Sequence, residues 1–325
     1  MLEISKRTLI NTILVPLLIL AYIKLYALTN LLAKLQYSLP LRYNNECSED
    51  DIFTITTQIQ EIKSWSNNEG LAANWHHSHR QLFTDKVYVI NLPHRKDRRR
   101  YMNDLFNTLE VDYELVQAVP ANSIPSKIPG LSTTANNSTA AMTLPELACL
   151  HSHISVLQDI QSKNHSLAAI FEDDVDLDYR IKAWVHKALA SIPKKIKWDL
   201  LFLGNFHSRA GDYDPTNHTF PELRPAVPIQ GTHAYVVNGH KSAQKLLGFL
   251  YKAEASLDLE LDYLNTYGDI TALTLFPPKA IQVRGPENLS DIYPDNHLKP
   301  DHYDLGNSST KNLMDRIKRC YIKFP

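Results

Sequence analysis

The stretch that decides the fold is LAAIFEDDVD, residues 167–176. Residues 167–171 form a continuous apolar run, which is typical of a strand that is covered on both faces of a sheet. Residues 172–176 follow at once and carry four carboxylates. In an extended backbone Glu172, Asp174 and Asp176 would share one face, and Asp173 would point the other way. The junction therefore predicts a buried strand that ends in a group of charged side chains.

Apolar runs of the same kind recur along the chain, separated by stretches with helical periodicity. The runs cover residues 87–90, 199–203 and 234–237, and the helical patterns cover residues 95–109, 146–160, 181–192 and 243–250. Strands that alternate with helices indicate an α/β protein with a mostly parallel sheet flanked by helices. In such a sheet, ligands bind beyond the carboxyl ends of the strands.

The acidic run needs a counter-charge. Two unit charges about 5 Å apart repel by roughly 3 kcal/mol at an effective dielectric constant of about 20. A hard divalent cation with oxygen ligands supplies the counter-charge and leaves positions open for two phosphates. Glu172, Asp173 and Asp174 are therefore the predicted ligands of Mn²⁺ or Mg²⁺. A solvated acidic loop has the same pattern and is the alternative interpretation.

The first apolar run leads into a basic segment, residues 94–100. A helix amino terminus that carries guanidinium groups is a favourable place for phosphate, so Arg95 and Arg98 are candidate phosphate ligands. Arg95, Arg98 and Arg99 are equally compatible with ordinary exposed positions at a helix start.

The amino terminus has the pattern of a membrane anchor. Lys6 and Arg7 precede an apolar stretch, and Lys24 is placed to snorkel toward one interface. Residues 1–35 are predicted to be a cytoplasmic tail and transmembrane signal anchor, with the rest of the chain in the lumen. A cleaved signal peptide is the competing interpretation. Glycosylation sequons, which agree with a luminal location, begin at Asn136, Asn137, Asn164, Asn217, Asn288 and Asn307.

Composition and charge narrow the remaining possibilities. The net charge of -1 gives no support for nucleic-acid binding. Residues 36–83 are polar and are predicted to be a stem, residues 84–298 a catalytic domain and residues 299–325 a tail. Of the three cysteines, Cys47 and Cys320 could pair in an oxidising lumen, whereas Cys149 lies in an apolar stretch. Three free thiols fit the sequence equally well.

Several segments, in this order, resemble the blocks of glycosyltransferase family 25, which contains bacterial lipooligosaccharide galactosyltransferases and animal collagen galactosyltransferases. The matching segments are VINLPHRKDRR (89–99), PELACLHSH (145–153), AIFEDDV (169–175), WDLLFLG (198–204), GTHAYVV (231–237) and LDLEL (257–261). Pro145 and Ala148 stand where the family usually has glycine. Residues 120–142 match no block, so the resemblance leaves the choice of acceptor open.

The resemblance implies a GT-A-like fold, a UDP-sugar donor, a bound Mn²⁺ or Mg²⁺ ion and inversion at the anomeric carbon. Inversion requires a base that deprotonates the acceptor hydroxyl. The catalytic candidates are Asp258 and, behind it, Glu260 or Asp262; Asp258 is also compatible with a helix cap. The candidates for binding or supporting the donor are Asn91, Arg95, Arg98, Glu146, His153 and His233.

The sequence therefore predicts a single-pass type II membrane enzyme of the endoplasmic reticulum or Golgi. It would transfer a hexose, galactose or glucose, from a UDP-sugar to a glycan or glycoprotein acceptor. Two alternatives remain open. A non-catalytic member of the fold would act as a glycan-binding protein. A metal-dependent phosphoesterase would need a second set of close metal ligands.

Overall fold

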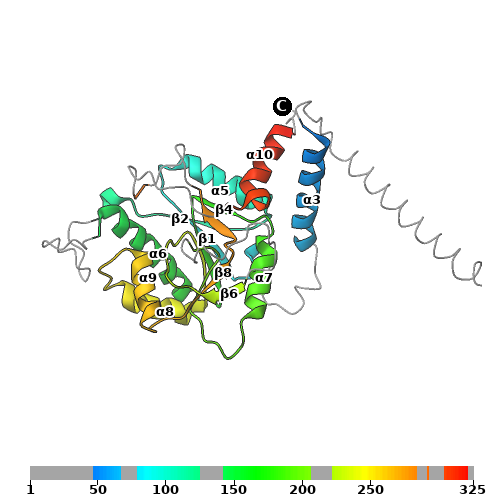
Figure 1. The fold of residues 1–325 in the computed structure, drawn as a ribbon. Coiled ribbons are helices and arrows are strands. Elements are labelled where there is room, and N and C mark those ends of the chain that lie inside the picture. Colours follow the sequence, from blue (N-terminus) through cyan, green and yellow to red (C-terminus); the bar gives the residue numbers. More distant parts are fainter. Residues whose placement is uncertain are drawn as a thin grey trace, which may run out of the picture. The chain divides into compact units, whose positions relative to one another are not determined.

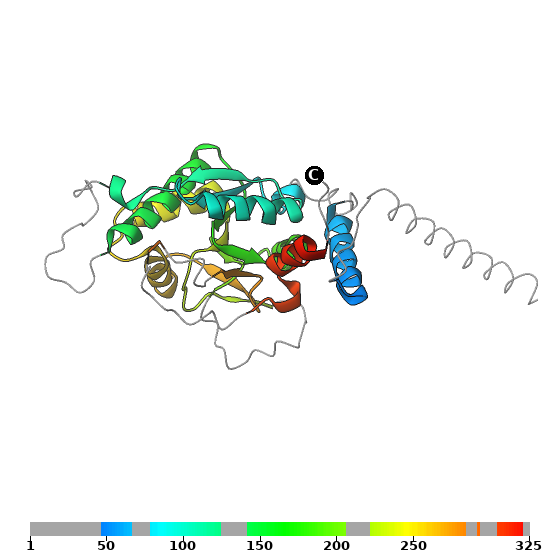
Figure 2. The ribbon, with the colours of Figure 1, turned by 90° about the horizontal axis from the view of Figure 1, so that it is seen from above.

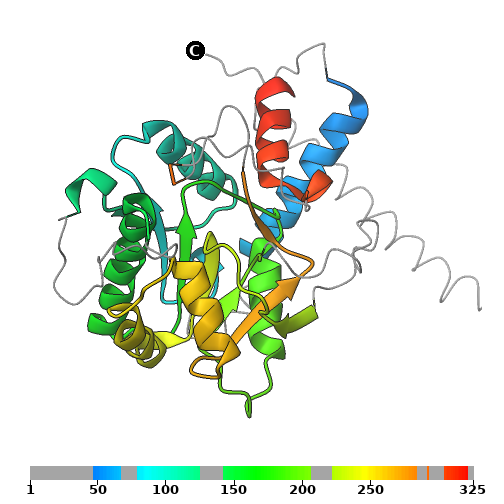
Figure 3. The same cartoon turned by 60° about the vertical axis from the view of Figure 1, so that its left-hand side comes forward.

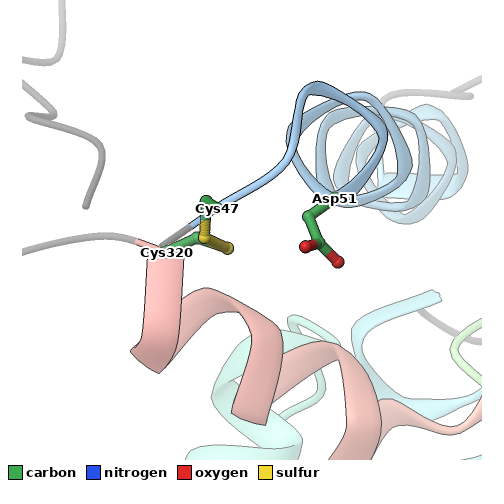
Figure 4. A group of neighbouring side chains, drawn as sticks. All are labelled: Cys47, Asp51 and Cys320. Atoms are coloured by element: carbon green, nitrogen blue, oxygen red, sulfur yellow. A yellow bond between two sulfur atoms is a disulfide. The ribbon is translucent and has the colours of Figure 1, made fainter. Parts of the chain in front are cut away.

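The computed structural model describes residues 47–66, 79–124, 142–205, 222–283, 291–292 and 304–320. Backbone contacts divide the chain into a large unit, Phe53–Arg316, and a small unit that joins Met1–Ile52 to Ile317–Pro325. In the small unit, Cys47 and Cys320 form a disulfide with Cα atoms 5.4 Å apart (Figure 4). The bond covalently joins two segments that are 273 residues apart in the sequence.

Strands and helices alternate through the large unit (Figure 1). The helices are α3 (Glu49–Ser66), α5 (Lys96–Thr108), α6 (Leu144–Ser162), α7 (Ile181–Ser191), α8 (Gly239–Leu250), α9 (Leu257–Thr266) and α10 (Thr310–Cys320), with short 3₁₀ turns η2 (His79–Gln81), η3 (Ala121–Ser123) and η5 (Gly306–Ser308). The strands are β1 (Lys86–Asn91), β2 (Glu114–Gln117), β3 (Ala168–Glu172), β4 (Val175–Leu177), β5 (Leu200–Phe202), β6 (Glu222–Pro225), β7 (Ala234–Val237), β8 (Ala272–Phe276) and β9 (Ala280–Gln282).

The main sheet has seven strands in the order β2-β1-β3-β7-β5-β8-β6. Strands β2, β1, β3, β5 and β8 point the same way, whereas β7 and β6 run against them. The predicted mostly parallel sheet flanked by helices is therefore confirmed. The four apolar runs of the sequence form β1, β3, β5 and β7.

Helices cover both faces of this sheet (Figures 1 and 2). On one face, α6, α8 and α9 share a hydrophobic core with the strands, and Figure 3 shows these helices gathered on one side. Ile170 of β3 belongs to this core, and its neighbour Phe171 points to the opposite face. There Phe171 meets Phe106 of α5, with ring centroids 5.4 Å apart. Burial on both faces explains why every residue of β3 before Glu172 is apolar.

A second sheet consists of β4 and β9, which pair antiparallel with Val175 opposite Gln282. It joins the main sheet where Lys279 and Ala280 donate backbone hydrogen bonds to the carbonyl of Leu203, at 2.8 and 3.1 Å. Gly204 permits this approach, because a Cβ atom there would lie 1.8 Å from the carbonyl oxygen of Ala280. The two sheets thereby place β9 beside the acidic turn that follows β3.

The predictions for the chain ends fall partly outside the described residues. The predicted anchor, residues 1–35, lies outside them, and no helix in the described part is long and apolar enough to span a membrane. The segment predicted as a stem contains helix α3. Gln58 of that helix donates to the carbonyl of Asn307, and Glu61 accepts from the hydroxyl of Tyr179 at 2.9 Å. The segment predicted as a tail contains α10.

Candidate functional site

A cavity lies at the carboxyl ends of β1 and β3. Arg98 of α5, Cys149 and His153 of α6, and Asp174 contribute polar groups to its wall. The full lining is Ile90, Leu92, Arg98, Ala118, Val119, Ala121, Pro145, Ala148, Cys149, Ser152, His153, Glu172, Asp173, Asp174, Gln282, Asp291 and Ile292. The chain thus brings together the basic segment after β1, the first turns of α6 and the acidic run after β3, at the edge where α/β proteins bind ligands.

The acidic run does not continue the strand. β3 ends at Glu172, Asp173 and Asp174 form a turn, and β4 begins at Val175. The alternation expected for an extended backbone is therefore wrong for this run. Asp173 and Asp174 converge on Arg98, whereas Asp176 points to the start of α10 and accepts from the backbone N–H of Lys311 at 3.0 Å.

Arg98 is the counter-charge of the acidic turn. Its Nη1 lies 2.9 Å from Oδ1 of Asp173, 3.2 Å from Oδ2 of Asp174 and 3.5 Å from Oδ2 of Asp291. The Arg98 side chain is only 8% exposed, so these ion pairs form largely out of water. Asn91, the last residue of β1, completes the arrangement by donating its Nδ2 to Oδ2 of Asp173 at 2.7 Å. Each oxygen of Asp173 therefore has a partner.

Asp174 is less well satisfied. Its Oδ2 accepts a hydrogen bond from Gln282 Nε2 at 2.8 Å, but its Oδ1 is buried and has no hydrogen-bond partner. Burial raises the pKa of Asp174; Arg98 opposes the rise, and the charges of Glu172 and Asp173 add to it. Burial also raises the pKa of Asp173, again against the effect of Arg98. The two carboxylates of the turn thus share one guanidinium, that of Arg98, which also contacts Asp291.

Glu172 faces a different set of partners. Its Oε1 accepts from the hydroxyl of Thr232 at 2.7 Å and lies 3.4 Å from Nε2 of His153. Nδ1 of His153 is in turn 2.8 Å from the hydroxyl of Tyr235. Burial works to raise the pKa of Glu172, but His153 and Thr232 outweigh it and lower the pKa. Glu172 is therefore held as a carboxylate on the α6 side of the cavity.

These positions decide how a hard cation fits. Among the described residues, Glu172, Asp173 and Asp174 do not bring one carboxylate oxygen each close enough together to coordinate a single ion. The unpartnered Oδ1 of Asp174, beside Asp173, suits a divalent cation with oxygen ligands. The site therefore fits Mn²⁺ or Mg²⁺ at Asp173 and Asp174, with Glu172 turned toward His153.

Other predicted site residues lie away from the cavity wall. Arg95 pairs with Asp97 and with the cavity residue Asp291. Glu146 accepts from Thr143 in a capping box that opens α6. His233 is buried at the start of β7, with Nε2 3.3 Å from the carbonyl oxygen of Ala280.

The three predicted bases, Asp258, Glu260 and Asp262, lie on α9 and do not line the cavity; Asp262 accepts from the backbone N–H of Ile229 at 2.7 Å. Asp258 accepts from the hydroxyl of Ser256 at 2.8 Å and from the backbone N–H of Gly231 at 3.3 Å. It thereby holds the loop that carries Thr232 to Glu172. Glu260 lies in the first turn of the same helix, and burial raises its pKa.

Several cavity residues were not predicted from the sequence. Asp291 and Gln282 lie beyond the last recognisable block, and only the fold brings them to Arg98 and Asp174. Thr232 and Tyr235 are not in the cavity wall but contact Glu172 and His153; both lie inside the GTHAYVV segment, from which only His233 was predicted. Cys149, which lies in an apolar stretch of the sequence, is a half-buried residue with a free thiol in the cavity wall, and burial raises the pKa of that thiol.

Comparison with known proteins gives the same assignment as the sequence blocks. The family model described as glycosyltransferase family 25 (LPS biosynthesis protein) matches residues 84–264. This match includes the acidic turn, Arg98, α6 and the start of α9, and it covers more than half of the chain.

Curated relatives are similar over about half of the chain. Procollagen galactosyltransferase 1-A of Xenopus laevis is 26% identical over 166 residues, which is 48% of this chain and 25% of the relative. Human procollagen galactosyltransferase 2 is 25% identical over 174 residues, 50% of this chain and 27% of the relative. Human inactive glycosyltransferase 25 family member 3 is 27% identical over 177 residues, 50% of this chain and 28% of the relative.

These matches each span only about a quarter of the relative's length. The family match, by contrast, runs from β1 into α9 and includes all of the cavity wall except Gln282, Asp291 and Ile292. The chain belongs to glycosyltransferase family 25.

Proposed function

We propose that this protein transfers a hexose, galactose or glucose, from a UDP-sugar to a glycan or glycoprotein acceptor, with inversion and with the help of Mn²⁺ or Mg²⁺. One observation carries the proposal: a buried acidic turn with an unpartnered carboxylate oxygen faces a cavity at the carboxyl edge of the sheet. Family 25 membership and similarity to procollagen galactosyltransferases support a sugar-transfer reaction. The GT-A-like assignment of the fold is part of this proposal.

The residues of the cavity would divide the work of binding the donor. Asp173 and Asp174 would hold the cation, which when bound supplies positive charge that stabilises the departing diphosphate. Asn91 and Arg98 fix Asp173, and Gln282 fixes Asp174, so the turn is preorganised before the donor arrives. Arg98 also offers a guanidinium to the phosphates from the first turn of α5.

An acceptor hydroxyl must lose its proton as the sugar bond forms. Asp258 is the proposed base, with Glu260 as the alternative. The position of Asp258 supports it only indirectly, because it holds the loop that brings Thr232 to the cavity residue Glu172. Substitution of each carboxylate in turn is therefore needed to identify the base.

The cellular setting is also a proposal. The basic and apolar pattern of residues 1–35 supports a signal anchor in the endoplasmic reticulum or Golgi membrane, with residues 84–298 in the lumen. The disulfide between Cys47 and Cys320 supports an oxidising compartment.

The decisive experiment offers the full chain a panel of UDP-sugars with Mn²⁺, with Mg²⁺ and with a chelator, and follows UDP release with and without glycan acceptors. We expect one UDP-hexose to be consumed only in the presence of metal. Asp174→Asn should abolish turnover. Asp176→Asn is the matched control: it removes the charge of a buried neighbour that faces Ser309 and Lys311 rather than the cavity. Full activity of Asp174→Asn would overturn the metal assignment.

A second function is favoured by the relatives named as inactive members of the family. A chain of this kind would bind a glycan or a UDP-sugar without turnover. It is distinguished by a UDP-sugar that raises the melting temperature of the protein while no UDP is released. A metal-dependent phosphoesterase would instead consume nucleoside diphosphates that carry no sugar.

A further inference from the structure

The α6 side of the cavity carries a second group of potential metal ligands. Cys149 and His153 are four residues apart on α6 and therefore lie on one face of the helix. Glu172, at the end of β3, completes the group. One thiol, one imidazole and one carboxylate ligand atom all lie within 4.8 Å of one another. This group is separate from the Asp173 and Asp174 carboxylates that contact Arg98.

The spacing of these atoms matches a tetrahedral zinc ion. With zinc bonds of about 2.0–2.3 Å, two ligand atoms on a tetrahedral zinc are about 3.3–3.6 Å apart. Nε2 of His153 and Oε1 of Glu172 are 3.4 Å apart. A zinc ion could therefore sit between them with little movement. The thiol of Cys149 lies within 4.8 Å of the other two ligand atoms, so it must approach them by at most about 1.5 Å.

The surroundings of His153 and Glu172 are those of metal ligands. His153 is 1% exposed, and its Nε2 has no well-formed hydrogen bond: Oε1 of Glu172 lies 3.4 Å away. Its other ring nitrogen, Nδ1, lies 2.8 Å from the hydroxyl of Tyr235, so Tyr235 fixes the ring with Nε2 turned toward Glu172. Thr232 fixes Glu172 in the same way by donating to Oε1. Outer partners of this kind typically orient histidine and carboxylate ligands on zinc.

We propose that Cys149, His153 and Glu172 bind one zinc ion, which leaves a fourth coordination position open to the cavity. On binding, the Cys149 thiol gives its proton to solvent and a zinc–sulfur bond forms. Three protein ligands with one open position are characteristic of zinc sites that bind water or substrate. The thiolate and imidazole select zinc, whereas Asp173 and Asp174 offer only oxygens and suit Mn²⁺ or Mg²⁺.

The proposal does not rest on the transferase activity, because its test measures the metal bond itself. The full chain is freed of metal with a chelator and titrated with Co²⁺, which replaces zinc and gives an intense near-ultraviolet absorption band when a thiolate binds it. The chain has three cysteines, and Cys47 and Cys320 are joined in the disulfide. A sulfur-to-cobalt band can therefore come only from Cys149.

We expect one equivalent of Co²⁺ to produce the band and one equivalent of Zn²⁺ to remove it. Cys149→Ser should abolish the band and His153→Ala should weaken cobalt binding at least tenfold. His151→Ala is the matched control, since His151 lies on α6 but outside the cavity wall, and it should leave the band unchanged. If cobalt binds the wild-type chain without the band, or if Zn²⁺ does not displace it, the proposal is wrong.

A second measurement needs no variant, in case Cys149→Ser fails to fold. Alkylation of the native wild-type chain by iodoacetamide, followed by peptide mass spectrometry, reports the accessibility of Cys149. Zn²⁺ should slow this alkylation at least tenfold, whereas Mg²⁺ at the same concentration should not. Equal rates with and without Zn²⁺ would contradict the site, whatever the result of the sugar-transfer assay.

Discussion

Nη1 of Arg98 lies 2.9 Å from Oδ1 of Asp173, and each side chain is only 8% exposed. The pair connects two segments that are 75 residues apart, the first turn of α5 and the turn after β3. Because both charges have left water, their mutual contact and the amide of Asn91 must replace the lost hydration. The same contacts fix the acidic turn in the cavity, so fold stability and the candidate site depend on one ion pair.

Replacing Arg98 tests this dependence. Arg98→Ala leaves Asp173 and Asp174 as buried carboxylates without their cation, which should lower the free energy of unfolding by about 3–5 kcal/mol at pH 7. Urea denaturation of the metal-free protein measures the change. Arg100→Ala, an exposed position on the same helix, should change stability by less than about 0.5 kcal/mol. Equal effects of the two substitutions would show that the buried ion pair has no special role.

The sequence predicts the strands around the cavity well, because β1, β3, β5 and β7 are buried on both faces and are therefore continuously apolar. It does not reveal β2, in which half-buried and exposed positions alternate, or the reversal of β7 between β3 and β5. Pairing direction depends on contacts between distant segments, which no local pattern records.

The same limit applies to the site. The sequence identifies Glu172, Asp173 and Asp174 as a charged group and predicts that all three bind the same cation. The turn at Asp173 and Asp174 separates Glu172 from the other two, and this separation follows from the pairing of β4 with β9. Gln282 and Asp291 reach the cavity from segments that carry no recognisable pattern, so only the folded chain assigns them.

The predicted base can be separated from a purely structural role. If Asp258 deprotonates the acceptor, Asp258→Asn should lower kcat by about 10²- to 10⁴-fold and leave UDP-sugar affinity within a factor of a few. Glu260→Gln, which removes the alternative base on the same helix turn, should reduce kcat far less; the opposite ranking would assign the base to Glu260. If Asp258 only holds the loop at Gly231, its substitution will weaken donor binding and stability with little change in kcat. Steady-state kinetics with thermal unfolding distinguishes these results.

Lys182 gives the protein a pH dependence unrelated to the cavity. Burial lowers the pKa of this lysine from 10.5 to about 8, with smaller effects of Glu110, Arg80 and Asp112. Between pH 8 and 10.5 the unfolded chain binds more protons at this residue than the folded chain, so this contribution to stability rises with pH. At pH 7 the folded protein carries the full cost of the buried charge.

Lys182→Met should therefore stabilise the protein at pH 7 by about 1–2 kcal/mol, after allowance for screening by solvent. The gain should shrink as the pH rises from 8 toward 10.5. Urea denaturation at a series of pH values measures this, with Lys187→Met as the control on the same helix at an exposed position. A gain that does not change with pH would mean that packing, rather than the charge of Lys182, causes it.

Gly204 tests the junction between the two sheets, and Gly248 in α8 serves as the control. A Cβ atom on Gly204 would lie 1.8 Å from the carbonyl oxygen of Ala280, so Gly204→Ala must push β9 away from the end of β5. We expect a loss of roughly 1–3 kcal/mol, which is typical of overpacking. Gly248, inside α8, has open space around its Cβ position, and Gly248→Ala should raise stability by about 0.5–1 kcal/mol.

The Gly204 substitution should also reach the cavity. β9 carries Gln282, which donates to Asp174, so displacement of β9 should weaken metal and donor binding as well as stability. Gly248→Ala should leave both binding steps unchanged. Thermal unfolding and Mn²⁺ titration of the two variants provide the comparison. If Gly204→Ala binds metal and donor as the wild type does, the position of β9 does not control Asp174.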